Sequence, residues 1–97
     1  MVDLEFDPAA RAEYREVVAW YQARSPGASA RFEAEVQRLM GVIVAYPMMF
    51  PNLNNVNRFA KLHHFPYSLI YAIEPDHIMI VAVSHASRKP GYWLDRP

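Results

Sequence analysis

The chain has 97 residues, of which 53% are hydrophobic and 13% aromatic, and it has no cysteine. This composition excludes a disordered chain, a disulfide-stabilised fold and thiolate metal sites. Lys and Arg together number 10, as do Asp and Glu, so the net charge is zero and gives no support to binding nucleic acid through phosphate neutralisation alone. The length predicts a single domain, residues 1–97, built around one apolar core.

The sequence shows no signal for a membrane or a cofactor. No apolar run approaches the roughly 20 residues that cross a bilayer, and the start, MVDLEFDP, is acidic rather than basic and then apolar. We therefore expect a cytoplasmic protein without membrane contact. There is no glycine-rich phosphate loop, nucleophile elbow or suggestive carboxylate pair, so we expect no cofactor.

The N-terminal part predicts a strand followed by a helix. Residues 2–6 alternate apolar and charged side chains, which is the period of a short edge strand with one wet face. Asp7 and Pro8 then supply an N-cap and a first-turn proline. The apolar helical stripe consists of Ala10, Tyr14, Val17, Val18 and Tyr21. The outer positions alternate in charge and are predicted to form a solvated face: Arg11, Glu13, Arg15 and Glu16.

A second helix is predicted to run antiparallel to the first. Ser25, Pro26 and Gly27 break the first helix, and apolar spacing resumes until Tyr46 and Pro47. Its apolar stripe is Ala28, Phe32, Val36, Leu39, Met40 and Ile43. Residues 47–56 contain two prolines and three asparagines and are predicted to form a loop, whose Met48, Met49 and Phe50 we expect to fill the core rather than form an exposed patch.

The rest of the chain predicts a three-stranded antiparallel sheet. Residues 57–64 are mixed in character, whereas residues 67–73 and 78–85 form a β-hairpin around a turn at residues 74–77. Both faces of this hairpin are apolar. The alternation places Tyr67, Leu69, Tyr71 and Ile73 opposite Ile70 and Ala72, and Ile78, Ile80 and Ala82 opposite Met79, Val81 and Val83. The face away from the helices must therefore be covered, and a partner segment is one candidate for the cover.

The C-terminal tail holds most of the chemically versatile side chains: His85, Arg88, Lys89, Tyr92, Trp93 and Arg96. A strand-end His suits acid or base catalysis, an Arg suits phosphate binding and an aromatic ring suits base stacking. Each also has a structural interpretation: His85 as a hydrogen-bonded residue and Trp93 as part of the core.

Two further features bear on a site. Arg58 could contact substrate, or it could form a buried ion pair with a helix carboxylate such as Glu33. His63 and His64 are adjacent, so on a strand they point to opposite faces and cannot share a metal ion; we expect no metal site.

The order of the elements and the stretches RFAKLHHFPYSLIYAI and VAVSHASRKPGYW resemble the ParE and RelE superfamily of toxins from bacterial type II toxin–antitoxin modules, which include plasmid stabilisation proteins. The resemblance spans the chain. Its most specific parts are Trp20-Tyr21, Phe65-Pro66-Tyr67, His85 with Arg88, and Pro90-Gly91-Tyr92-Trp93. It implies a RelE/ParE-like α+β fold: an edge strand, a helix hairpin, a three-stranded sheet and a short tail.

The resemblance implies a toxin that arrests growth and is neutralised by an antitoxin, whose flexible C-terminal segment wraps the sheet and helices. A heterotetramer or larger complex with the antitoxin is one assembly that it allows. Together with the two apolar sheet faces, it leads us to predict these partner-binding residues: Tyr67, Leu69, Tyr71, Met79, Val81, Tyr92 and Trp93.

Two branches of the superfamily remain as alternatives. RelE-like members cut mRNA on the ribosome without a metal ion and often place an Arg before the core-strand Leu-Val-Tyr, whereas here Ser68 precedes Leu69-Ile70-Tyr71. This absence and the zero net charge favour the ParE-like branch, whose members inhibit DNA gyrase without being enzymes. The nuclease alternative would use His85, Arg88, Tyr92 and Arg58, and a degenerate member would only bind its antitoxin.

Overall fold

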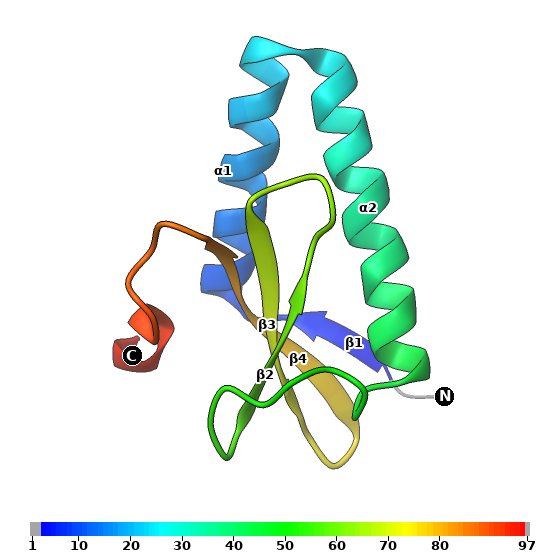
Figure 1. The fold of residues 1–97 in the computed structure, drawn as a ribbon, viewed down its shortest axis with the longest axis vertical. Helices are drawn as coiled ribbons and strands as arrows, with labels where there is room; N and C mark the ends of the chain where they lie inside the picture. Colours follow the sequence, from blue (N-terminus) through cyan, green and yellow to red (C-terminus); the bar gives the residue numbers. More distant parts are fainter. Residues whose placement is uncertain (1–2, 97) are drawn as a thin grey trace.

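The protein is an α+β fold in which two helices pack against one side of a sheet (Figure 1). The computed structural model describes residues 3–96, so Val2 of the predicted first strand lies outside the described residues. The elements are β1 (Asp3–Phe6), α1 (Pro8–Arg24), α2 (Pro26–Ala45), β2 (Asn57–Lys61), β3 (Tyr67–Ile73), β4 (His77–His85) and the 3-10 helix η1 (Tyr92–Asp95). Within residues 3–96, neither helix is long and apolar enough to cross a bilayer.

Local capping explains the helix hairpin. The Asp7 side chain accepts a hydrogen bond from the Ala9 N–H at 3.1 Å and Pro8 opens α1, as predicted. Ser25 serves both helices, because its N–H donates to the Tyr21 carbonyl at 2.6 Å and its hydroxyl accepts from the Ala28 N–H at 3.4 Å. One residue therefore ends α1 and begins α2, which leaves the two helices antiparallel.

The sheet has four strands in the order β1-β4-β3-β2. β2, β3 and β4 form the predicted antiparallel meander, and β1 adds to the edge of β4 in parallel. The register of β1 on β4 ends where Phe6 pairs with Ile80, because the chain turns into α1 at Asp7. Among residues 3–96, no strand pairs with β4 on that side beyond Ile80.

A bulge in β4 corrects the predicted assignment of side chains to sheet faces. Ile80 pairs with Tyr71 but Ala82 pairs with Ile70, so Val81 is an extra residue in the register. Strict alternation would put Ala82 with Ile80 on the helix side. The bulge reverses the parity, and Val83 joins the core that includes Ile80.

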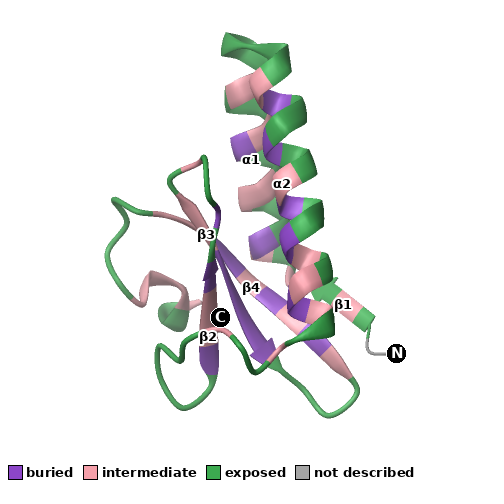
Figure 2. Cartoon of the chain, turned by 45° about the vertical axis from the view of Figure 1, so that its right-hand side comes forward, coloured by how far each residue is buried: buried purple, intermediate pink, exposed green. Residues whose placement is uncertain are grey.

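The core lies between the helix pair and the sheet. On the two helices, the buried residues lie on the inward faces (Figure 2). Four members of the predicted α2 stripe are buried: Phe32, Val36, Leu39 and Ile43. On α1, Ala10 and Val17 are buried while Tyr14, Val18 and Tyr21 pack partly buried against the core. The helical periodicity in the sequence therefore gave the correct inward faces.

The loop after α2 differs from its prediction. Phe50 packs against the core, but Met48 is 68% exposed and Met49 is 61% exposed, so the prediction that they fill the core is wrong. The reason is spatial: the loop closes the end of the core with the ring of Phe50, which contacts Tyr71 edge to face at 6.3 Å between ring centroids. The two methionines are left outside.

Candidate functional site

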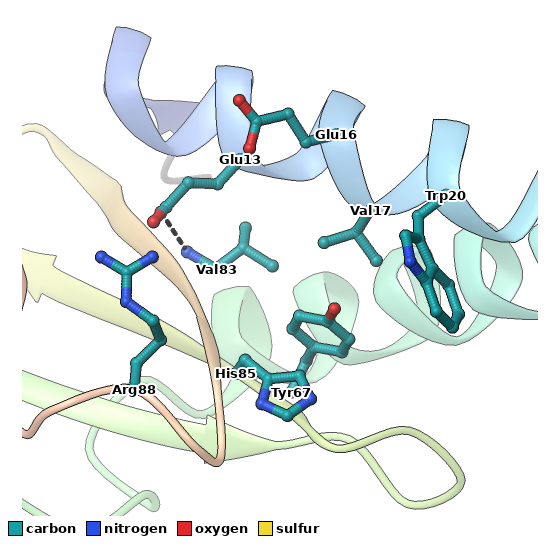
Figure 3. A pocket seen from close by; sticks show the side chains of 8 residues that line it. All are labelled: Glu13, Glu16, Val17, Trp20, Tyr67, Val83, His85 and Arg88. Atoms are coloured by element: carbon teal, nitrogen blue, oxygen red, sulfur yellow. Dashed lines mark hydrogen bonds between the residues drawn. The ribbon is translucent and has the colours of Figure 1, made fainter.

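A pocket of about 220 Å³ lies between α1 and the end of β4 (Figure 3). It is lined by Glu13, Glu16, Val17 and Trp20 of α1, by Tyr67, Val83 and His85 of the sheet, and by Arg88 of the tail. Trp20 is 50% exposed and carries the Arg24 guanidinium over its ring at 3.8 Å. The pocket thus combines an aromatic wall with acidic and basic groups.

Glu13 connects three parts of the molecule, which contradicts its predicted place on a solvated face. Its side chain is only 16% exposed. One carboxylate oxygen accepts the Val83 N–H at 3.0 Å, and the other accepts the Tyr92 hydroxyl at 2.5 Å and the Arg96 guanidinium at 2.6 Å. A signal was present in the sequence: Glu13 lies three residues after Ala10 and four before Val17, which places it beside the inward face.

Tyr92 is held as a neutral hydrogen-bond donor. Burial, followed by its hydrogen bond to the Glu13 carboxylate, raises the pKa of Tyr92 to about 12. The Arg88 guanidinium lies over the Tyr92 ring at 3.9 Å from its centroid. Tyr92 therefore supports Arg88 physically, and its hydroxyl is poorly suited to exchanging a proton near neutral pH.

His85 has one ring nitrogen engaged. Its Nδ1 accepts the backbone N–H of Ser87 at 2.9 Å, so neutral His85 carries its proton on Nε2. The ring also contacts Tyr67 edge to face, with centroids 4.9 Å apart. The structural interpretation of His85 as a hydrogen-bonded residue is confirmed, and only Nε2 is available to the pocket.

Arg58 is not part of this pocket. Its Nη1 donates to the Phe50 carbonyl at 2.6 Å and to the Met48 carbonyl at 3.2 Å. Glu33 is exposed on α2 and forms no ion pair with Arg58, so this alternative for Arg58 is wrong. The loop after α2 places the backbone carbonyls of Met48 and Phe50 against the Arg58 guanidinium, so these carbonyls are its partners rather than a helix carboxylate.

The tail covers part of the sheet face that is turned away from the helices. The Trp93 indole N–H donates to the Asn57 side chain at 3.2 Å, and Asn57 is 4% exposed. Trp93 also lines a pocket of about 180 Å³ with Ser68, Ser84 and Arg88. The cover for which a partner segment was one candidate is thus supplied in part by the tail of the chain itself.

The predicted partner-binding residues divide into two groups. Leu69 and Tyr71 are 0% exposed and pack under the helices, so their prediction as contact residues is wrong. Leu69 and Tyr71 do lie on the opposite face of β3 from Ile70, as predicted, but theirs is the face that the helices cover. The others are partly exposed: Tyr67, Met79, Val81, Tyr92 and Trp93.

His63 and His64 lie in the loop after β2 rather than on a strand. Glu35 of α2 accepts the backbone N–H of His63 and the His64 ring at 3.1 Å. Burial alone raises the pKa of Glu35, but these hydrogen bonds outweigh it and leave the pKa below its ordinary value of 4.5. Residues 3–96 contain no cluster of three side chains suited to a metal ion.

Glu35 should make stability depend on pH in a defined direction. Because its pKa is lower in the folded state, its ionised form stabilises the protein above pH 4.5, and this contribution is lost as the pH falls through the folded-state value. We expect Glu35→Gln to reduce the free energy of unfolding at pH 7, and the difference from the unsubstituted protein to disappear as the pH falls through the folded-state pKa of Glu35. Urea unfolding across this range tests it, and a constant difference between the curves would contradict it.

Comparison with known proteins assigns the chain to a family. The family model described as "ParE toxin of type II toxin-antitoxin system, parDE" matches residues 4–90. The chain belongs to the ParE toxin family. The predicted membership of the superfamily, on its ParE-like side, is confirmed.

A solved structure supports the fold of this ParE family member. The chain is similar to a protein of the "Chromosomal ParDE TA system from P. aeruginosa", with a TM-score of 0.68 and 14% identity over 88% of this chain and 96% of that chain. The predicted α+β architecture is confirmed by this likeness and by the strand order. No curated protein matches the sequence.

Proposed function

We propose that this ParE family toxin arrests growth by binding DNA gyrase, without being an enzyme. The observation that carries the proposal is that three of the four candidate nuclease side chains are engaged within the protein: Tyr92 by Glu13, Arg58 by loop carbonyls and His85 Nδ1 by Ser87. Cleavage without a metal ion needs proton transfer near neutral pH and a cation at the phosphate. Here the residue before Leu69-Ile70-Tyr71, where RelE-like members often have an Arg, is Ser68.

Gyrase supercoiling is the direct test. Purified toxin at micromolar excess should inhibit supercoiling of relaxed plasmid and accumulate cleaved DNA. Supercoiling that continues unchanged would contradict the proposal. Toxin premixed with its cognate antitoxin is the control, since it contains the same protein with its contact surface occupied.

We further propose that a cognate antitoxin neutralises the toxin by covering the exposed apolar side chains around the tail and the sheet. The structural relative comes from a ParDE toxin–antitoxin system, and this chain leaves Trp20 half exposed in one pocket with partly exposed Tyr67, while Met79 and Val81 of β4 are also partly exposed. Amide exchange should show added protection at β4 and α1 in the complex. Unchanged exchange there would exclude this surface.

Ribosome-dependent cleavage of mRNA is the second candidate, because His85 and Arg88 line one pocket. Under this alternative, primer extension on translated mRNA shows new 5′ ends that disappear in His85→Ala and Arg88→Ala variants with unchanged thermal stability. Growth arrest without new 5′ ends would exclude it.

A further inference from the structure

Among the described residues, the tail that follows β4 presents two exposed cations without an ion-pair partner, and one of them is held over an aromatic ring. Residues 86–90 are exposed and include Arg88 and Lys89. Within residues 3–96, neither of these two side chains forms an ion pair. Arg88 differs from Lys89 in being held in place, because its guanidinium lies over the Tyr92 ring at 3.9 Å from the centroid and Arg88 lines two pockets.

The Tyr92 ring under Arg88 is held in place by one carboxylate, that of Glu13. Three tail side chains hydrogen-bond to the body of the protein: Tyr92, Trp93 and Arg96. Two of the three end on the same oxygen of Glu13, whose other oxygen is fixed by the Val83 N–H of β4. The Arg96 guanidinium lies 5.1 Å from the centre of the Tyr92 ring and also donates to the Val81 carbonyl at 2.8 Å. Glu13 thus sets where the ring stands, and the ring sets where Arg88 stands.

We infer that Glu13 is a positioning residue of the toxin, which acts through Tyr92 to hold Arg88 as the contact of the tail with a carboxylate on the target protein. The inference rests on the proposed binding of gyrase. A planar guanidinium on a fixed ring suits two-point binding of a carboxylate, because little side-chain freedom remains to be lost. A protein carboxylate fits better than nucleic acid phosphate, since the chain has zero net charge to attract a polyanion.

A double-mutant cycle on full-length toxin tests the coupling. Glu13→Gln and Arg88→Ala should each weaken gyrase binding by at least roughly tenfold, as expected for a hydrogen bond to a charged group, and the double variant should lose no more than Arg88→Ala alone. Glu74→Gln, at the exposed turn at the other end of β4, is the matched control and should bind normally. Losses that multiply in the double variant would overturn the inference.

A second readout separates this inference from the proposed function. The Arg88 Nε–H resonance should be shifted by the Tyr92 ring in the unsubstituted toxin and in Glu74→Gln, and should return toward the value of a free arginine in Glu13→Gln. If the toxin does not bind gyrase, the proposed function fails while this measurement still reports on the positioning. If Glu13→Gln does not fold, Tyr92→Phe removes the same hydrogen bond and should mobilise Arg88. An Arg88 resonance that stays shifted in the folded variant would overturn the positioning role.

Discussion

Replacing Phe32 by alanine is expected to lower the free energy of unfolding by about 3–5 kcal/mol, the usual cost of removing a buried phenylalanine. Phe32 is fully buried and its ring contacts Tyr14, Tyr21, Phe65 and Tyr67 at centroid distances of 5.8, 5.7, 5.3 and 5.8 Å. These rings come from α1, the β2–β3 loop and β3, so a cavity at Phe32 weakens the contact of both helices with the sheet.

Urea unfolding followed by circular dichroism measures this effect. Small domains have about 5–15 kcal/mol of stability in total, so Phe32→Ala should be partly unfolded at 37 °C. The matched control is Phe32→Leu, which keeps most of the volume and should lose roughly 1–1.5 kcal/mol. A loss below about 1.5 kcal/mol for the alanine variant would mean that the neighbouring rings close the cavity.

Arg58→Ala should lower the free energy of unfolding by about 1.5–3 kcal/mol, the usual contribution of one hydrogen bond to a charged group, because its bond to the Phe50 carbonyl is partly buried while its bond to the Met48 carbonyl is exposed and adds little. Arg58 donates to the Met48 and Phe50 carbonyls, and the buried Tyr71 hydroxyl donates to the Pro47 carbonyl at 2.6 Å. These bonds fix the loop that holds Phe50 against the core. The variant should therefore expose residues 47–56 to proteolysis before the rest of the chain.

The matched control for Arg58→Ala is Tyr71→Phe, which removes the neighbouring bond to the same loop and should cost about 1 kcal/mol. Limited proteolysis and urea unfolding on both variants give the comparison. Equal stability of Arg58→Ala and the unsubstituted protein, with loss of toxicity, would return Arg58 to the list of functional candidates.

Periodicity and capping were sufficient to predict the elements of this fold. Asp7-Pro8 and Ser25-Pro26 mark helix ends through bonds to nearby backbone groups, and these depend only on local sequence. The face reversal at Val81 was not predictable, because a bulge depends on how β3 and β4 pair across the turn. Ala82 and Val83 are both small and apolar, so their side chains do not indicate which of the two faces the helices.

The candidate site was predicted in part. His85 and Arg88 line one pocket and the Arg88 guanidinium lies over the Tyr92 ring, and the structure adds the anchor of Tyr92 on a distant helix. Glu13 was missed because a carboxylate among alternating charges reads as solvated unless its partners 70 or more residues away are known. The partners of Arg58 were not predicted because they are backbone carbonyls, which every residue has and which no sequence pattern marks.

The free side of β4 beyond Ile80 has a consequence for how truncated toxins should be interpreted. A bare strand edge recruits strands from other molecules and promotes aggregation. Here Glu13 accepts the Val83 N–H and Arg96 donates to the Val81 carbonyl, so side chains occupy the edge that a fifth strand would otherwise fill. Deleting the tail removes Arg88 and also Arg96, which frees the Val81 carbonyl of this edge while Glu13 still accepts the Val83 N–H. If a shortened chain is inactive, the cause can be either self-association or loss of the Arg88 contact. Single side-chain replacements distinguish these two causes.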